Sequence, residues 1–374
     1  MKIAILSTPS APLPPVGYAG IERVVYELQK GLTKKNHDVT VFATGDSIIS
    51  SKLAYYYEKS LGPSVKLTYN SYFFLNHIYE FVKYIQGKSF DIIHLNDAGR
   101  YSLYFSQFIK QPFVTTLHGS YFPVENDPYD IRKEKINQLH IFKNTPFISI
   151  SNIQRVAIPD LNYIGTVYNS VDMQDYSFSD TGGDYICWLG RVTPAKGLDT
   201  AIEISESLSK QLRAFGFVDA GEQSYFETAI KPHMGNLFNF SGAAKEVSQK
   251  NDFYRGSKVF LFPIRWHEPF GIVMAEAMAC GTPVVAYARG SVPEVVIDGV
   301  TGFIVHPDNE NHDREYIIKK TGAEGLREAV ERIYAMPESE YRAMRAACRK
   351  HIENSFTTEK MAEGYLEAYQ KVLA

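Results

Sequence analysis

The chain has 374 residues, more than one hydrophobic core usually organises, so two domains are expected. Hydrophobic residues make up 45% and charged residues 22%, which is ordinary globular usage and excludes a disordered or fibrous protein. The formal net charge of −3 gives no overall attraction to polyanions, so no nucleic-acid partner is expected.

The N-terminal run MKIAILSTPS predicts a first strand, because it lacks the longer apolar region and cleavage pattern of a signal peptide. Nothing approaches the roughly 18 consecutive apolar residues of a membrane-spanning helix. The three cysteines are widely spaced and predict neither a disulfide framework nor a zinc site. These features together lead us to expect a cytoplasmic location.

Short apolar runs rich in strand-forming residues alternate with helical patterns in both halves of the chain. Helices are expected at residues 22–35 and, at the end of the chain, 356–373. The strands expected in the first half are residues 3–6, 39–43, 91–95, 113–117, 147–150 and 166–168. Those expected in the second half are residues 185–189, 215–219, 237–240, 259–263, 283–286 and 303–305. Each set predicts a parallel sheet covered by helices on both faces.

A polar, turn-prone segment at residues 169–184 separates the two sets and contains Gly182 and Gly183. It is the best candidate for a linker. Two parallel α/β domains in series predict a cleft between them, because ligands of such sheets bind beyond the carboxyl ends of the strands.

The richest segment is residues 265–281, RWHEPFGIVMAEAMACG, which follows a predicted strand. Glu268 precedes a helix that Phe270, Gly271 and Ile272 would open, where backbone N–H groups can donate to sugar hydroxyls or phosphate oxygens. Glu276 lies among apolar residues of that helix and needs a partner, because a buried carboxylate is costly alone. A ribose diol would serve. An ion pair to an arginine, or a solvated helix edge, is an equal alternative.

A second loop, GRVTPAKG at residues 190–197, places Arg191 and Lys196 after another predicted strand. An arginine fork and a mobile lysine suit a diphosphate, and together they can neutralise charge on a departing nucleoside diphosphate. The alternative is a pair of solvated cations without a function.

These two loops resemble the E-x7-E and G-R-x4-K-G patterns of family 4 retaining glycosyltransferases. The resemblance implies a GT-B fold, with two Rossmann-like domains whose parallel sheets face each other across a cleft. It implies an N-terminal acceptor-side domain at residues 1–172, a nucleotide-sugar-binding domain at 173–355, and a C-terminal helix at 356–374 that crosses back to the first domain. In the first domain, residues 55–90 are rich in aromatic side chains and are read equally well as acceptor pocket or as core.

The resemblance also implies a role for each matching donor-side residue. Glu268 would face the donor sugar near the reacting carbon, and Glu276 would bind the ribose diol. The residues with the other donor-binding roles are Phe270, Gly271 and Ile272 for sugar hydroxyls, Arg191 and Lys196 for the pyrophosphate, and Gly242 and Ala243 for the nucleobase. The chain departs from the family pattern at Ser170, where the linker motif usually has glycine, and at the turn 219–221, where phosphate contact is less secure.

In the first half, the resemblance assigns Gly20, in the loop after the first strand, to the donor phosphate. It assigns His118, directly after a strand, to the donor sugar as part of the catalytic set, although a lone histidine is often structural. Asp97 is a weaker candidate for acceptor binding, with a solvated loop carboxylate as the alternative. Lys30, Lys34 and Lys35 leave peripheral membrane contact open, but three lysines are ordinary on a solvated helix face.

The expected reaction transfers a hexose from a nucleoside-diphosphate sugar to a hydroxyl of a glycan, lipid or small molecule, with retention of configuration. UDP is the first choice of nucleotide, with GDP and ADP as alternatives. No D-x-D sequence occurs, so no metal and no cofactor are expected. The competing functions are a nucleotide-sugar epimerase or phosphorylase on a similar scaffold, and a nucleotide-sugar sensor without turnover.

Overall fold

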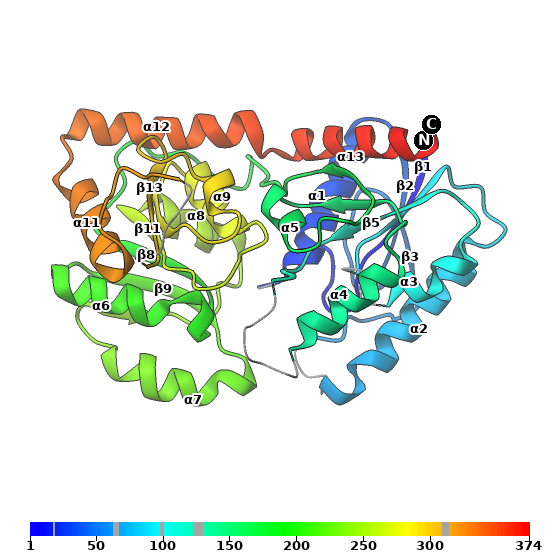
Figure 1. The fold of residues 1–374 in the computed structure, drawn as a ribbon, viewed down its shortest axis with the longest axis horizontal. Coiled ribbons are helices and arrows are strands. Elements are labelled where there is room, and N and C mark those ends of the chain that lie inside the picture. Colours follow the sequence, from blue (N-terminus) through cyan, green and yellow to red (C-terminus); the bar gives the residue numbers. More distant parts are fainter. Residues whose placement is uncertain (18, 63–66, 98–100, 123–129, 309–313) are drawn as a thin grey trace. The chain divides into compact units, whose positions relative to one another are not determined.

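The computed structural model describes residues 1–374 except residue 18 and residues 63–66, 98–100, 123–129 and 309–313. The chain forms two compact units, each with its own parallel sheet (Figure 1). The N-terminal unit is Met1–Ser170 with Thr358–Ala374, and the C-terminal unit is Val171–Thr357. These limits differ by two residues from the boundaries expected from the sequence. The expected α/β class with two Rossmann-like sheets is confirmed.

The N-terminal unit has a seven-stranded sheet in the order β3-β2-β1-β4-β5-β6-β7, with every pair parallel. Its strands are β1 (Lys2–Leu6), β2 (Asp38–Ala43), β3 (Lys52–Tyr55), β4 (Ile92–Leu95), β5 (Phe113–Leu117), β6 (Phe147–Ser149) and β7 (Tyr163–Thr166). Its helices are α1 (Gly20–Lys34), α2 (Leu67–Ile85), α3 (Ser102–Phe105), η1 (Ser106–Phe108), α4 (Ile131–Ile141), α5 (Asn152–Val156) and α13 (Thr358–Leu373).

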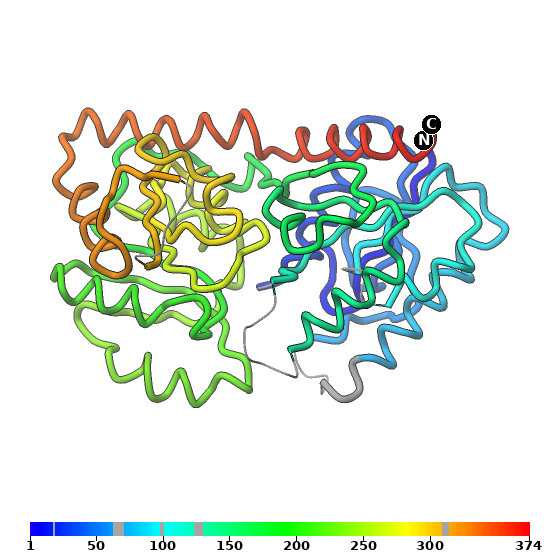
Figure 2. The backbone as a smooth tube through the Cα atoms, viewed as in Figure 1, coloured from blue at the N-terminus to red at the C-terminus, as the bar shows by residue number. Residues whose placement is uncertain are grey.

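Alternate residues of these strands serve the two faces of the sheet. Ala4, Leu6, Ile93 and Leu95 pack in one core with α2. On β4, the intervening His94 instead meets Tyr369 of α13, and α13 itself packs against α1. Figure 2 shows this return of the chain, with the red last helix beside the blue first helix. The last helix therefore belongs to the core of the first unit.

The C-terminal unit has a six-stranded parallel sheet in the order β10-β9-β8-β11-β12-β13. Its strands are β8 (Ile186–Arg191), β9 (Leu212–Phe217), β10 (Phe238–Phe240), β11 (Val259–Phe262), β12 (Val284–Tyr287) and β13 (Gly302–Val305). Its helices are η2 (Pro194–Lys196), α6 (Leu198–Leu208), η3 (Ala220–Glu222), α7 (Gln223–Tyr225), η4 (Phe226–Ile230), η5 (Lys231–His233), α8 (Val247–Arg255), α9 (Ile272–Ala279), α10 (Val292–Val295), α11 (Gly322–Ala335) and α12 (Glu338–Ser355).

Four expectations about single elements need correction. The structure adds β3, an edge strand with two exposed residues among its four, whose weak apolar pattern gave no strand prediction. The helix expected at 356–373 begins at Thr358, because α12 ends at Ser355 and Phe356 is not helical. Two strands lie earlier than expected, the one at 166–168 as β7 and the one at 215–219 as β9.

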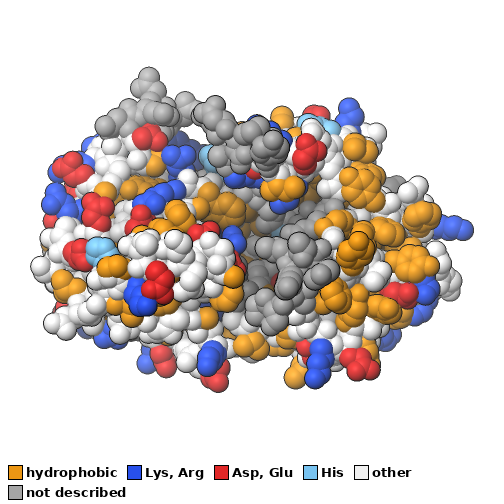
Figure 3. Space-filling model, turned by 90° about the horizontal axis from the view of Figure 1, so that it is seen from below, with side chains coloured by type: hydrophobic (Ala, Val, Ile, Leu, Met, Phe, Trp, Pro, Cys, Tyr) orange, Lys and Arg blue, Asp and Glu red, His pale blue; other side chains and the backbone are white. Residues whose placement is uncertain are grey.

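The aromatic-rich stretch 55–90 is divided between core and surface. Phe74 and Phe81 are buried, whereas Tyr55, Tyr72 and Tyr79 are exposed. In Figure 3, hydrophobic side chains gather on the surface of the N-terminal unit, at the right of the view. Among the described residues, no helix combines the length and the apolar character that crossing a membrane requires.

The expected linker is packed rather than loose where it carries its two glycines. Gly182 has φ +64°, and a Cβ there would lie 2.5 Å from Nη1 of Arg345. A Cβ on Gly183 would overlap the carbonyl oxygen of Gly256. Both glycines therefore allow close approach of the backbone, instead of supplying flexibility.

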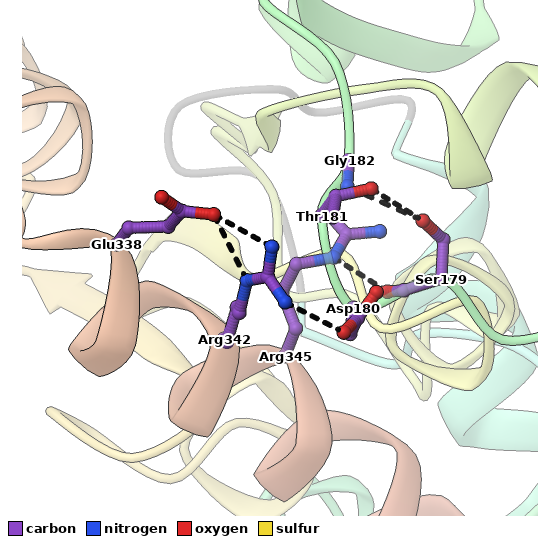
Figure 4. Close-up of polar contacts among 7 residues, drawn as sticks. All are labelled: Ser179, Asp180, Thr181, Gly182, Glu338, Arg342 and Arg345. Atoms are coloured by element: carbon purple, nitrogen blue, oxygen red, sulfur yellow. Dashed lines mark hydrogen bonds and ion pairs between the residues drawn. The ribbon is translucent and has the colours of Figure 1, made fainter.

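Arg345 of α12 holds the segment around Ser179 against the rest of the C-terminal unit (Figure 4). Its side chain is fully buried, and its nitrogens donate to the hydroxyl of Tyr341. The carbonyl oxygens that accept from it belong to Ser179, Arg255, Ser257 and Cys280, at 2.7–3.3 Å. Arg255 and Cys280 stand at the carboxyl ends of α8 and α9, where the helix dipole is negative and favours a cation. The buried charge of Arg345 thus fixes the end of α9, whose start lies in the candidate site.

Candidate active site

The C-terminal unit has a topological switch point between β8 and β11. Its six strands follow the doubly wound order, in which the chain leaves in one direction after β8 and in the other after β11. Ligands of such sheets bind at the carboxyl ends of these two strands. The loops that follow β8 and β11 are the two segments that the sequence singled out.

The loop after β8 is folded tightly against the end of β11. Gly197 has φ +71°, and a Cβ there would overlap the carbonyl oxygen of Pro263. Arg265 fixes the same contact, because its backbone N–H donates to Ala195 O at 2.9 Å and its Nη1 donates to Pro194 O at 3.0 Å. The two loops therefore form one surface.

Lys196 and Glu268 meet on that surface. Lys196 Nζ lies 2.5 Å from Glu268 Oε2, and their side chains are only 7% and 11% exposed. The indole Nε1 of Trp266 donates to the same oxygen at 2.9 Å, and the lysine nitrogen lies 4.6 Å from the centre of the indole ring. A buried cation and carboxylate stabilise each other here, because either charge alone would be costly in this environment.

Arg191 lies on the same loop at the end of β8. Its side chain is 39% exposed, and its Nη1 is 3.7 Å from Asp219 Oδ2 in the turn after β9. An ion pair this long and this exposed contributes little to stability.

The helix α9 begins beside Glu268. Gly271 has φ +74°, a left-handed conformation that favours glycine, and a Cβ there would lie 3.2 Å from Glu268 Cγ. Phe270 is buried and packs edge-on against Phe356, at 5.6 Å between ring centres. Ile272 opens α9 as its first residue. The positive end of the helix thus begins beside Glu268.

Glu276 has an intramolecular partner, although not the arginine considered from the sequence. Lys250 Nζ donates to Oε1, and the hydroxyl of Tyr254 donates to Oε2 at 3.2 Å. Glu276 is 3% exposed, and burial raises the pKa of Tyr254 well above its usual value, so this hydroxyl stays protonated. The solvated alternative for Glu276 is excluded.

Gly242 and Ala243 follow β10 at the edge of the sheet, two strands from β8. Gly242 has φ +71°, and its carbonyl accepts from Gly216 N at 2.8 Å. Ala243 is exposed. Contact of these residues with a nucleobase stays a prediction.

The three candidates of the first half lie in the N-terminal unit. Gly20 is the first residue of α1, and no atom lies within 4 Å of a Cβ added there. His118 Nε2 lies 2.9 Å from Asn96 Oδ1. Burial lowers the pKa of His118 to about 3, and the ring is therefore neutral near pH 7.

Asp97 is a buried carboxylate rather than the solvated one that we weighed against acceptor binding. It is 3% exposed and accepts from the backbone N–H groups of Tyr101 and Ser102, at 3.0 and 2.8 Å. The carboxylate therefore caps the start of α3. A contact with an acceptor stays a prediction.

Among the described residues, no group of three His, Cys, Asp or Glu side chains is placed to hold a metal ion. Of the sequence-predicted residues, the structure brings Lys196 and Glu268 into direct contact and places Gly271 beside Glu268.

Two protein-family models match this chain. The family model for Glycosyltransferase Family 4 matches residues 18–174. The family model for Glycosyl transferases group 1 matches residues 173–333. Together the two matches run through most of both units. The chain belongs to the family 4 glycosyltransferases. Glycosyl transfer is therefore the class of reaction to which its candidate site belongs.

Solved structures show the GT-B fold for this glycosyltransferase. Sucrose-phosphate synthase from Thermosynechococcus elongatus superimposes with a TM-score of 0.80 at 20% identity, covering 99% of this chain and 98% of that one. HepE from Anabaena, solved with UDP-glucose, gives 0.74 at 17% identity over 99% of this chain and 100% of its own.

Among curated relatives, spore coat protein SA of Bacillus subtilis is 23% identical, over 99% of this chain and 100% of its own length. Alpha-maltose-1-phosphate synthase of Mycolicibacterium smegmatis is 43% identical, but over only 52% of this chain and 50% of its own length.

Three contacts of the glycosyltransferase site escaped the sequence interpretation. They are those of Trp266, Lys250 and Tyr254. Trp266 stands two residues before Glu268, and a single tryptophan beside a candidate carboxylate was a usable signal. Lys250 and Tyr254 share a face of α8 at spacing i, i+4, which the sequence shows only once Glu276 is known to lie opposite.

Proposed function

We propose that this glycosyltransferase moves a hexose from a nucleoside-diphosphate sugar to an acceptor hydroxyl, with retention of configuration and without a metal ion. The observation that carries the proposal is the buried pair of Lys196 and Glu268 at the switch point, beside the start of α9. A cation, a carboxylate and a helix N-terminus at one place match the charges that separate during sugar transfer.

In the proposed reaction the donor diphosphate takes Lys196 from Glu268 and draws Arg191 from its long contact with Asp219. Both cations then neutralise the charge that grows on the leaving phosphate oxygen. Glu268, released from its ion pair, faces the positive charge that develops at the anomeric carbon.

The bond from the anomeric carbon to the phosphate oxygen breaks as the bond to the acceptor oxygen forms on the same face. The proton of the acceptor hydroxyl passes to the departing phosphate oxygen, so atoms and charges balance. Amides at the start of α9 hold the sugar, and Glu276 holds the ribose. In the N-terminal unit, Gly20 and His118 add contacts to the donor, and that unit recognises the acceptor.

We propose the nucleotide of the donor from a related structure. The solved complex of HepE contains UDP-glucose, which favours UDP as the first nucleotide to test here. GDP and ADP sugars follow.

The test is a transfer assay with labelled UDP, GDP and ADP hexoses, a panel of hydroxyl acceptors, and EDTA in parallel. We expect nucleoside diphosphate to be released only with an acceptor, at a rate that EDTA does not change, and an axial donor linkage to give an axial product by NMR coupling constants. An altered sugar on intact nucleotide would show an epimerase, and phosphate-dependent cleavage a phosphorylase. Binding without release for every acceptor would show a sensor. An inverted product would overturn retention alone.

A further inference from the structure

The carboxylate of Glu276 is held from both sides by one helix. Lys250 and Tyr254 stand one turn apart on α8, and each donates to a different oxygen of Glu276. Lys250 is 17% exposed and its nitrogen also lies 5.7 Å from the centre of the Tyr176 ring, so its ammonium group has a second contact besides Glu276. Such an arrangement determines both the charge and the direction of the carboxylate.

We propose that Lys250 is a positioning residue, which holds Glu276 as an oriented anion so that the site can distinguish ribose from 2′-deoxyribose in the donor. The inference rests on the proposed function, because it assumes that Glu276 binds the ribose of a nucleoside diphosphate. It adds a residue that the motifs do not contain, and it names what that residue controls.

The positions of Lys250 and Tyr254 on the two oxygens of Glu276 support the positioning role. A carboxylate has about four acceptor positions, so donors from α8 on both oxygens are compatible with a diol on the same group. With one donor on each oxygen, the plane of the carboxylate is fixed by α8. The two hydroxyls of a ribose can then meet both oxygens without further rotation of the side chain.

Charge makes the assignment testable. Glu276 is 3% exposed, so removal of the lysine would leave a buried carboxylate without its cation and would raise its pKa. A protonated Glu276 accepts fewer hydrogen bonds, so it binds the two ribose hydroxyls more weakly. The titratable and charged groups around it are Lys250 and Tyr254 of α8, Tyr176 before β8, Cys280 at the end of α9, and Arg345 and Arg349 of α12.

The experiment compares UDP with dUDP, GDP with dGDP and ADP with dADP, by calorimetric titration between pH 6 and pH 9. For the nucleotide that the wild type binds, we expect the ribose form to bind about tenfold more tightly or better, at every pH, because a hydrogen bond to a charged group is lost in the deoxy form. In Glu276→Gln this ratio falls to near one without pH dependence.

In Lys250→Met the ratio falls, and it falls most at low pH, because the buried carboxylate has lost its cation. Lys250→Arg keeps the cation and the wild-type ratio, and Tyr254→Phe keeps a ratio independent of pH. Because the ratio is measured within one protein, a general loss of affinity or stability does not change it. Lys231→Met, on an exposed surface pair of the same unit, is the matched control and behaves as wild type.

Two results separate the failures. If the wild type binds none of the six nucleotides, or binds both forms of each equally, the proposed role of Glu276 fails. If the wild type discriminates and Glu276→Gln does not, but Lys250→Met keeps the full ratio at every pH, the inference about Lys250 fails while the proposed function stands.

Discussion

The buried contacts that join α13 to the sheet of the N-terminal unit are hydrogen bonds between neutral groups, whereas the switch point of the C-terminal unit holds a buried ion pair. His94 lies between the Tyr369 hydroxyl at 2.8 Å and Thr116 Oγ1 at 2.7 Å, and burial lowers its pKa well below the usual value. The corresponding interior of the second unit holds the ion pairs of Lys196 and Lys250 and the enclosed guanidinium of Arg345.

The two units have one strand order in common, so the sheet does not dictate this difference. Neutral hydrogen bonds suffice to join α13 to its sheet. Buried charges cost desolvation, and their geometry must be held closely to repay it. Buried carboxylates occur in both units, Glu27 and Asp97 among them in the first, so it is the place of the Lys196–Glu268 pair at the switch point that points to charge handling during the reaction.

The largest expected effect comes from breaking the charged cluster. Lys196→Ala and Glu268→Gln each lower kcat by roughly 10²- to 10³-fold, because each removes an interaction with charge that forms in the transition state. His118→Asn replaces a neutral contact and lowers it by roughly tenfold or less. Steady-state kinetics with the best donor checks this order. An equal loss in all three variants would remove the functional contrast between the units.

The next effect concerns stability and depends on Arg345. Arg345→Leu removes the side-chain donor of four carbonyl oxygens, of which that of Cys280 keeps a second donor, Ser179 N, and it destabilises the C-terminal unit by about 3 kcal/mol or more. Both tryptophans of the chain, Trp188 and Trp266, lie in this unit, so their fluorescence in urea reports its unfolding. Arg342→Leu, on the same helix with solvated partners, changes the transition by less than about 0.5 kcal/mol. Similar losses in both variants would contradict the role of the buried guanidinium.

A third effect concerns the pH at which each unit unfolds in acid. Burial lowers the pKa of His77 to about 4 and that of His118 to about 3, against about 6.5 when unfolded. The unfolded chain therefore binds more protons, and stability falls as the pH drops from about 6.5 toward these values. For His77 alone, the free energy of unfolding is lower by about 3 kcal/mol below pH 4 than near pH 7.

We therefore expect far-UV circular dichroism to report loss of the N-terminal unit at a higher pH than tryptophan fluorescence reports change in the C-terminal unit. His77→Gln removes one titrating group and makes the pH dependence of the first transition shallower. Coincident transitions by the two probes, with no effect of this substitution, would be evidence against the contrast.

The sequence indicated the two loops of the site but not their contact. Lys196 and Glu268 are 72 residues apart, and each was recognised by its own local pattern after a strand. That the lysine faces the carboxylate depends on the strand order β8-β11, which no local pattern contains. Alternation of strands and helices was enough for the fold class, because each sheet buries both of its faces.

The misses have a common physical cause, which is that a side chain's surroundings come from elements distant in the sequence. Lys250 belongs to no motif that the sequence analysis considered, yet it meets a buried carboxylate of α9. Asp97 looked like a loop carboxylate but is enclosed by the helix that it caps. Residues 52–55 form a strand because β2 offers a free edge, although half of the strand is exposed.

The smallest expected effect tests the surface between α1 and α13. Lys34 pairs with Glu359 at 2.7 Å and Lys35 with Glu363 at 2.9 Å, so neither lysine projects as the unpaired cation that membrane contact would favour. The lysines of these pairs are 67% and 31% exposed, and solvent screens such contacts strongly. Lys34→Ala and Lys35→Ala should each cost less than about 1 kcal/mol in urea unfolding of the N-terminal unit, and less still in high salt. A larger loss that salt did not reduce would mean that these pairs, rather than the neutral network of His94, hold the last helix in place.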